Sequence, residues 1–258
     1  GGKTGNNLTP IDIVNFATAF AFFIRDESKK DKPKIVVGRD ARISGEMLEG
    51  LVNNTLVAMG IQVVNLGLST TPTVEMAVID LEADGGIILT ASHNPKQWNA
   101  LKLVNAKGEF ISASEGEALL QLIEKDDFNY SNIDKIGSIT SDNTQIDKHI
   151  KKILALEMVD VEAIRNANFK VAVDSVNSTG GISILPLLKA LGVENVFDIY
   201  SEPSGIFPHN PEPLPEHLNA LMDLVLTNKA DVGFVVDPDV DRLAIVNENG
   251  IPFGEEYT

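Results

Sequence analysis

The stretch ADGGIIL at residues 83–89 decides the fold of this chain, because ADVGFVV at residues 230–236 aligns with it without a gap. Each copy is a short apolar run behind an Ala-Asp pair and is typical of a buried strand. A second match follows each run: KLVNAKG at 102–108 and AIVNENG at 244–250, both typical of β-hairpins with a glycine in the turn. Matches that recur in the same order predict a duplicated domain.

Helical and strand-like patterns alternate along both halves, which predicts an α/β fold with mainly parallel strands. Helices are predicted to begin at Thr9-Pro10, Ser44, Thr71 and about Pro215. The predicted strands are residues 34–38, 61–66 and 86–89 in the first half and 169–173, 196–200 and 233–236 in the second. We therefore expect two tandem repeated α/β domains with mixed, mainly parallel sheets. Their expected limits are 1–140 and 141–253, joined within the polar stretch 126–147.

Composition narrows the classes of partner. The 258 residues include 21 Lys and Arg against 37 Asp and Glu, a net charge of −16. Such a surface repels nucleic acid and anionic membranes, so we expect neither as a partner. Cysteine is absent, which excludes disulfides and cysteine-ligated zinc and fits a cytoplasmic location. No apolar run approaches the roughly 20 residues that a membrane helix needs.

The two equivalent third strands end in loops of complementary chemistry. One leads into TASHNP at residues 90–95, which offers the hydroxyl of Ser92, and the other into DPDVDR at residues 237–242. Ligands of open α/β sheets bind beyond the carboxyl ends of strands, so we expect these loops to face each other across a cleft. Ser92 alone could be an ordinary loop serine. A serine facing a metal site favours phosphoryl transfer.

Asp237, Asp239 and Asp241 can converge on one hard cation, Mg²⁺ or Ca²⁺, because all their ligand atoms are oxygens. The alternative is a solvated acidic turn, but three like charges this close repel one another unless a cation neutralises them. An EF-hand is a further alternative, since these residues and Glu248 match its first, third, fifth and twelfth positions. Arg242 stands where that loop needs glycine, and strands are predicted on both sides.

Residues 90–95 and 237–242 resemble the phosphoserine loop and the metal loop of the α-D-phosphohexomutase superfamily, which includes phosphoglucomutase, phosphomannomutase and phosphoglucosamine mutase. The resemblance implies that Ser92 carries a phosphoryl group and that one Mg²⁺ per chain is held by this group with Asp237, Asp239 and Asp241. It also implies an isomerase that interconverts hexose 1-phosphate and hexose 6-phosphate through a bisphosphorylated sugar. A glucose 1,6-bisphosphate-type activator would load the serine.

The same resemblance assigns the supporting residues. Lys102 is the expected general acid/base, Arg242 and His93 support charge and position, and Asn99, Lys102 and Arg242 contact the sugar phosphate. Two departures from the family pattern occur: Pro238 and Val240 replace the usual glycines of the metal loop, and residues 99–102 read NALK where NGIK is commoner.

Members of this superfamily have four domains, so we expect this chain to supply the first two, with 254–258 opening a third. A fragment of this kind is expected to show little turnover. Two other functions stay open. The first is a fragment that binds metal and sugar phosphate without catalysis. The second is a HAD-like phosphatase, in which an aspartate is the nucleophile, although its acidic loop normally follows the first strand.

Overall fold

The computed structural model describes residues 1–253 and divides the chain into two compact units. Unit 1 comprises Gly1–Arg39, Ser44–Ala91 and Gln97–Gln145, and unit 2 comprises Asp40–Ile43, Ser92–Lys96 and the residues from 146 onward. Two short segments of the first half therefore belong to unit 2. The boundary expected between residues 140 and 141 stays a prediction. The segment expected to open a third domain, 254–258, lies outside the described residues.

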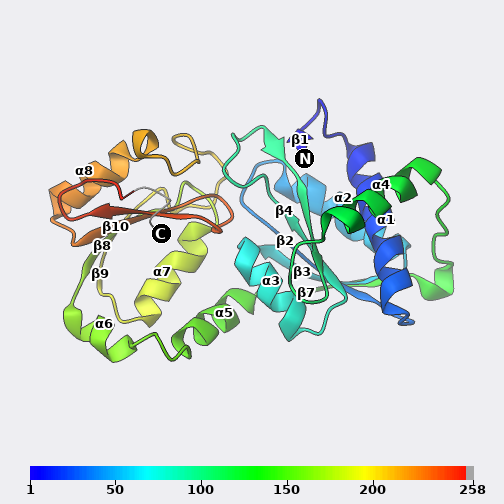
Figure 1. The fold of residues 1–258 in the computed structure, drawn as a ribbon, viewed down its shortest axis with the longest axis horizontal. Helices are drawn as coiled ribbons and strands as arrows, with labels where there is room; N and C mark the ends of the chain where they lie inside the picture. Colours follow the sequence, from blue (N-terminus) through cyan, green and yellow to red (C-terminus); the bar gives the residue numbers. More distant parts are fainter. Residues whose placement is uncertain (254–258) are drawn as a thin grey trace. The chain divides into compact units, whose positions relative to one another are not determined.

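Five strands form the main sheet of unit 1: β2 (Lys34–Arg39), β3 (Gln62–Leu68), β4 (Gly85–Leu89), β6 (Leu101–Asn105) and β7 (Ser138–Ser141). Their order is β6-β4-β2-β3-β7, and only β6 runs antiparallel to its neighbour (Figure 1). A separate antiparallel ladder pairs β1 (Gly2–Lys3) with β5 (Trp98–Asn99). The mixed, mainly parallel sheet predicted for the first half is confirmed.

Helices cover both faces of this sheet. Helices α1 (Pro10–Ser28), α2 (Gly45–Ala58) and α4 (Ala113–Lys125) share one core, and α3 (Thr71–Asp80) shares the other. Successive side chains of a strand point to opposite faces. Accordingly, Ile35 and Val37 of β2 pack with α1 and α2, whereas Val36 packs with α3. The third strand β4 is buried along its whole length, as its apolar sequence predicts.

Local sequence signals set the start of the first helix. The Thr9 hydroxyl accepts the backbone N–H of Asp12, while the Asp12 carboxylate accepts the backbone N–H of Thr9 at 2.7 Å. This reciprocal capping satisfies two N–H groups that the helix leaves without internal partners. Pro10 occupies the first turn, where a missing N–H costs nothing. The helix start predicted at Thr9-Pro10 is confirmed.

Unit 2 repeats the topology of unit 1. Its strands are β8 (Lys170–Asp174), β9 (Asn195–Ile199), β10 (Val232–Val236) and β11 (Leu243–Asn247), preceded by α5 (Gln145–Leu154) and α6 (Val161–Ala167). The order β11-β10-β8-β9 matches β6-β4-β2-β3, and β11, like β6, is the antiparallel member. Helix α7 (Gly180–Ala190) packs with the Val171 face of β8, and α8 (Asn219–Asn228) packs with the Ala172 face. The repeated architecture is confirmed.

Two segments differ from the expectation. The polar stretch 126–147 contains a short 3₁₀ helix, η1 (Ile133–Lys135), and strand β7, which pairs parallel with β3. The helix expected to begin at about Pro215 starts later. A 3₁₀ turn, η2 (Pro215–His217), comes first, and α8 begins at Asn219. The proline fixes its own backbone angle but donates no N–H, so it suits the turn that leads into the helix.

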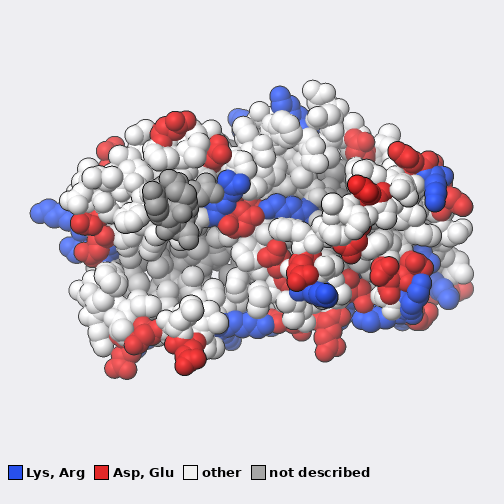
Figure 2. All heavy atoms as spheres, viewed as in Figure 1, with Lys and Arg blue, Asp and Glu red and all other residues white. Residues whose placement is uncertain are grey.

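Acidic and basic side chains are interspersed on the face drawn in Figure 2 and do not separate into an acidic and a basic area. None of the helices within residues 1–253 is long and apolar enough to span a bilayer.

Candidate functional site

The loop that follows β4 and the loop that follows β10 meet within unit 2. We call Ser92–Lys96 the serine loop and residues 237–242 the acidic loop. The Ser92 hydroxyl donates a hydrogen bond to Oδ2 of Asp237, with 2.9 Å between the oxygens. This contact joins residues 145 positions apart in the sequence. The structure therefore brings the expected nucleophile onto the first of the expected metal ligands.

The acidic loop gathers its carboxylates on one point. One oxygen each from Asp237, Asp239 and Asp241 lies within 4.8 Å of the others; the first two residues are buried and the third is exposed. Oδ1 of Asp237 accepts the backbone N–H groups of Asp241 and Arg242, both at 3.2 Å. The curl of the backbone is thus fixed by the same carboxyl group that receives Ser92.

Electrostatic strain in this cluster is concentrated on Asp237. Burial, followed by the charges of Asp239 and Asp241, raises the pKa of Asp237 to about 8, although the hydrogen bond from Ser92 opposes the shift. Carboxylates arranged in this way are stabilised when a cation neutralises them. The donor set is all oxygen, which suits Mg²⁺ or Ca²⁺ and not a thiolate-seeking metal. A hard divalent cation therefore fits the residues present.

Two non-glycine residues of the site have left-handed backbone conformations: Ser92 at φ 51° and Val240 at φ 60°. A positive φ is uncommon outside glycine and is a real outlier for a β-branched residue. This explains why the family pattern usually has glycine at the position of Val240. Strain of this kind persists only where the surroundings hold it, and it clusters at functional sites.

Polar side chains behind the acidic loop hold the Pro238 carbonyl. Ser178 and Thr179 donate their hydroxyls to this oxygen at 2.6 and 2.8 Å, and both residues are fully buried. The Ser178 oxygen also accepts the backbone N–H of Ala41 at 3.2 Å. The acidic loop is therefore tied to the segment Asp40–Ile43 through one hydroxyl group.

The structure places His93 beside Ser92. Nδ1 of His93 lies 3.4 Å from the Ser92 hydroxyl oxygen, and Nε2 lies 3.9 Å from Glu212. The expected role of His93 in supporting charge and position stays a prediction, and neighbouring serine and histidine residues do not readily pair as nucleophile and base. Both distances are at the long limit for their interaction.

Lys102 and Asn99, the other predicted residues, lie in unit 1. Lys102 is on β6, with its ammonium group 5.6 Å from the ring centre of Phe110. Asn99 is fully buried; its amide donates to the Ser44 hydroxyl at 2.9 Å and its carbonyl accepts the Ala100 N–H. Arg242 belongs to unit 2 and is partly buried, directly after Asp241.

Sequence reasoning missed the buried contacts of Arg42 and His209. Arg42 is completely buried and binds the serine loop, while His209 contacts the buried Asp174 at the end of β8. One signal was present, since the first strand of each half ends in an aspartate, Asp40 in one and Asp174 in the other. An acidic residue at the end of the first strand in both halves indicates that the two aspartates have equivalent structural roles.

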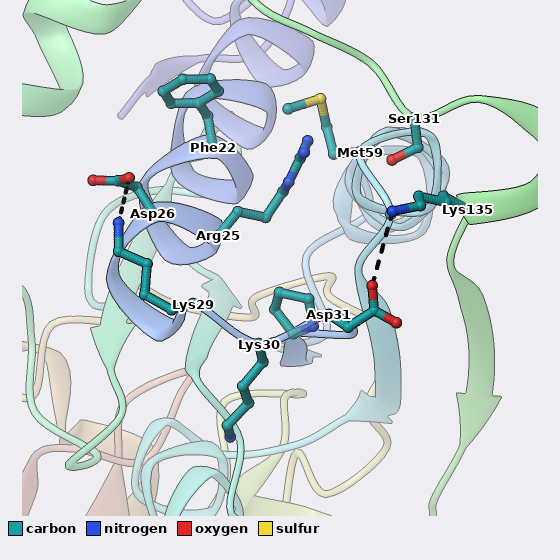
Figure 3. A pocket seen from close by; sticks show the side chains of 11 residues that line it. Phe22, Arg25, Asp26, Lys29, Lys30, Asp31, Met59, Ser131 and Lys135 are labelled. Atoms are coloured by element: carbon teal, nitrogen blue, oxygen red, sulfur yellow. Dashed lines mark hydrogen bonds and ion pairs between the residues drawn. The ribbon is translucent and has the colours of Figure 1, made fainter.

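A surface pocket of about 400 Å³ in unit 1 has no part in this site (Figure 3). It lies against the C-terminal end of α1, where two of its lysines approach carboxylates. Lys29 pairs with Asp26 at 2.6 Å, and Lys135 approaches Asp31 at 4.0 Å. Basic side chains at a helix C-terminus also offset the negative end of its dipole. Arg25, which also lines the pocket, donates to the backbone carbonyl of Asn129 at 3.1 Å.

Comparisons with known proteins agree with this geometry. The phosphoglucomutase/phosphomannomutase alpha/beta/alpha domain I matches residues 2–130, and domain II of the same family matches residues 147–250. A phosphoglucomutase/phosphomannomutase of Thermococcus kodakarensis is 34% identical over 250 residues, covering 96% of this chain and 54% of that protein. A phosphoglucosamine/phosphogalactosamine mutase of Sulfurisphaera tokodaii is 32% identical over 252 residues, covering 96% and 53%.

Among solved structures, a phosphoglucomutase/phosphomannomutase family protein of Burkholderia thailandensis has a TM-score of 0.84 at 29% identity, covering 97% of this chain and 54% of that one. The chain thus spans about half the length of the relatives it matches. The matched regions contain both the serine loop and the acidic loop. The chain belongs to the phosphoglucomutase/phosphomannomutase family, within the phosphohexomutase superfamily, and comprises its first two α/β/α domains.

Proposed function

We propose that this chain carries the phosphoryl-transfer half of a phosphohexomutase, an isomerase that interconverts hexose 1-phosphate and hexose 6-phosphate. The observation that carries the proposal is the 2.9 Å hydrogen bond from the Ser92 hydroxyl to Asp237, in a cluster of three carboxylates. A serine hydroxyl held at a cation-binding site suits phosphoryl transfer, because the transferred group carries several negative charges.

The exchange begins with a bisphosphorylated hexose as donor. The Ser92 oxygen attacks phosphorus, the Oγ–P bond forms, and the bond from phosphorus to the sugar oxygen breaks. In the net exchange the hydroxyl proton of Ser92 passes to that sugar oxygen. In the reverse direction phospho-Ser92 returns its group to the other end of a hexose monophosphate. Donation to the 6-hydroxyl of hexose 1-phosphate, followed by return of the 1-phosphoryl group to Ser92, converts the 1-phosphate into the 6-phosphate.

Asp237, Asp239 and Asp241 would hold one Mg²⁺ together with the phosphate on Ser92. When bound, the cation offsets the negative charge that moves with the phosphoryl group. Asp237 orients the hydroxyl of the unmodified serine, and the backbone N–H groups that it accepts keep the carboxyl group from rotating. The residues of the chain thus fix the nucleophile before the donor arrives.

The supporting roles follow the residues available. We propose Lys102 as the general acid/base at the sugar oxygen, with Asn99 and Lys102 contacting the sugar phosphate. Arg242 contributes positive charge beside the carboxylates, and His93 lies near the nucleophile. A hexose 1,6-bisphosphate such as glucose 1,6-bisphosphate would act as activator by loading Ser92. The chain spans about half the length of these relatives, and we propose that it shows little turnover by itself.

Mass spectrometry of the phosphorylated chain tests this proposal. The chain is incubated with Mg²⁺ and glucose 1,6-bisphosphate, and the Ser92→Ala variant is treated in parallel. The expected result is one added phosphoryl group, located on Ser92 by peptide analysis and absent from S92A. A phosphoryl group on an aspartate that persists in S92A would indicate a HAD-like phosphatase. Mg²⁺ binding without any modification would indicate a binding fragment without transfer chemistry.

A further inference from the structure

Arg42 is the largest fully buried side chain of the described residues, and it lies beneath the serine loop. Its side chain has no exposed surface, and Nε pairs with Oδ2 of the equally buried Asp40 at 2.9 Å. The terminal nitrogens donate to backbone carbonyls of the serine loop: Nη1 to Pro95 at 2.9 Å, and Nη2 to Asn94 at 2.7 Å and to Ser92. One guanidinium group thus collects three carbonyls from four consecutive residues.

Only an arginine can make this set of contacts. The guanidinium group is planar and presents five N–H donors in a fixed fork, whereas lysine has a single ammonium nitrogen. The ring of Phe207 covers the guanidinium carbon at 5.1 Å from its centroid. A charge without solvent access needs such complete pairing, because an unpaired buried charge is very costly. Asp40 and Phe207 therefore hold Arg42 in addition to its contacts with the serine loop.

Of the three carbonyls that Arg42 binds, that of Ser92 matters most for the nucleophile. Ser92 has φ 51°, a conformation that costs a non-glycine residue free energy and that must be held by its surroundings. The hydrogen bond from Arg42 fixes the direction of the Ser92 carbonyl and thereby the peptide that follows it. With the backbone in this conformation, the Ser92 hydroxyl reaches Asp237 at 2.9 Å.

The segment that carries Arg42 is also bound to the acidic loop. The N–H of Ala41 donates to the Ser178 oxygen at 3.2 Å, and the Ser178 hydroxyl donates to the Pro238 carbonyl at 2.6 Å. A single segment, Asp40–Ile43, whose first three residues are buried, therefore holds the serine loop through Arg42 and the acidic loop through Ser178. Movement of this segment would change the distance between nucleophile and carboxylates.

We propose that Arg42 is a positioning residue for Ser92: its guanidinium group maintains the left-handed conformation of the serine loop and thereby sets the rate at which Ser92 takes up a phosphoryl group. Arg42 is too deeply buried to contact a sugar phosphate, so it acts through the loop backbone. The inference rests on the proposed function, because it assigns a rate to the phosphorylation of Ser92. The effect of Arg42 on the conformation of Ser92 can be measured without any reaction.

The test is Arg42→Lys, which keeps a cation beside Asp40 but cannot bind all three carbonyls. Three quantities are measured: the rate of Ser92 phosphorylation by glucose 1,6-bisphosphate, Mg²⁺ affinity by calorimetry, and the Ser92 signals in NMR spectra of serine-labelled protein. We expect phosphorylation to slow at least about tenfold, since small displacements of a reacting group cost up to about a hundredfold. Mg²⁺ affinity should stay within about twofold, because all three carboxylates remain. The Ser92 Cα and Cβ shifts should leave their left-handed values.

Arg25→Lys is the matched control. Arg25 also donates to a backbone carbonyl, that of Asn129 at 3.1 Å, but it lies in unit 1 on an exposed surface. This variant should leave the phosphorylation rate and the Ser92 signals unchanged. If Arg42→Lys does not fold, Phe207→Leu removes the ring over the guanidinium group and should produce the same changes in weaker form.

Each outcome separates the two claims. If the unmodified chain takes up phosphate on Ser92 and Arg42→Lys does so equally fast with unchanged Ser92 signals, the inference is wrong and the proposed function stands. If the unmodified chain takes up no phosphate, the proposed function fails. The NMR signals of Arg42→Lys, or of Phe207→Leu, then decide alone whether Arg42 sets the conformation of Ser92.

Discussion

Asp237 uses its two carboxylate oxygens for two different tasks: Oδ2 receives the Ser92 hydroxyl at 2.9 Å, and Oδ1 receives the backbone N–H groups of Asp241 and Arg242 at 3.2 Å. One side chain thus links the nucleophile to the curl of the acidic loop. Its pKa is raised to about 8 by burial and by the neighbouring carboxylates, so the arrangement is costly without a cation. We therefore expect Asp237 to affect both Mg²⁺ affinity and the phosphorylation of Ser92.

Asp237→Asn is expected to weaken Mg²⁺ binding by at least about tenfold, because cation affinity depends on the number of charged ligands. Phosphorylation of Ser92 should fall with it. Calorimetric titration with Mg²⁺ measures the effect. The control is Asp231→Asn, because Asp231 also accepts a backbone N–H, that of Lys170, at the other end of the sheet. Unchanged Mg²⁺ affinity in D237N would show that this carboxylate is not a ligand.

Mg²⁺ affinity should rise with pH up to about 8, the pKa of Asp237. Below that value a proton occupies the carboxyl group and competes with the cation, so each unit of pH costs up to about tenfold in affinity. In the metal-free chain the sign for stability is opposite. The raised pKa of this acid means that ionisation destabilises the folded state as pH rises from about 4 towards 8. Titrations at about pH 6 and 8 in dilute Mg²⁺ test the first claim, and equal affinities would contradict it.

Val240→Gly is expected to stabilise the chain by about 1 kcal/mol, because relief of a left-handed β-branched residue exceeds the entropic cost of glycine. Val240 has φ 60° and lies between two of the carboxylates. The midpoint of urea denaturation measures the change. Lys229→Gly provides a comparison, since Lys229 has φ 50° at the end of α8 without a branched Cβ, and its gain should be smaller. A lower midpoint for V240G would show that the valine side chain contributes more by packing than it costs in strain.

The elements that could be predicted from the sequence are those whose signals are local. β4 and β10 were predicted because an apolar run and a following polar loop are visible in a few residues, and their repeat reinforced the interpretation. Strand β7, in contrast, has four exposed residues and no alternation of polar and apolar side chains. It forms because its backbone pairs with β3, which is an effect of the assembled sheet.

The site divides in the same way. Ser92 and the three aspartates were predicted because residue type and spacing indicate their chemistry, and their roles stay proposals. The role of Arg42 could not be predicted, because a lone arginine after a strand reads as a surface residue. Its burial depends on carbonyls of the serine loop about 50 positions later, and on Phe207. The pairing of His209 with Asp174 likewise joins residues 35 positions apart, across a loop whose path the sequence does not specify.

The His209 pair yields the last prediction, a pH dependence of stability. Nε2 of His209 lies 2.9 Å from the fully buried carboxylate of Asp174, and Nδ1 lies 2.8 Å from the Asn210 carbonyl. Both partners can accept hydrogen bonds, so this arrangement favours the ring that has a proton on each nitrogen. Burial opposes this charge, but the hydrogen bond and charge of Asp174, with the Asn210 carbonyl, outweigh it and raise the pKa of His209.

A raised pKa of a histidine means that the folded state binds the proton more tightly than the unfolded chain does. The contribution to stability is therefore complete below about pH 6.5, the usual value, and is lost as pH rises through the raised pKa. His209→Gln should lower the free energy of unfolding by about 2 kcal/mol below that pH, because a hydrogen bond to a charged group is removed. Above the raised pKa the loss should be smaller.

Urea denaturation of both proteins at about pH 6 and pH 8.5 measures this difference. The control is His217→Gln, since His217 lies in η2 and contacts the Glu212 backbone carbonyl and the exposed carboxylate of Glu216, not a buried one. The control should keep the pH dependence of the unmodified chain, whereas H209Q should lose part of it. An identical pH dependence in all three proteins would mean that the pair is not charged, and that the loop is held to β8 by its neutral hydrogen bonds alone.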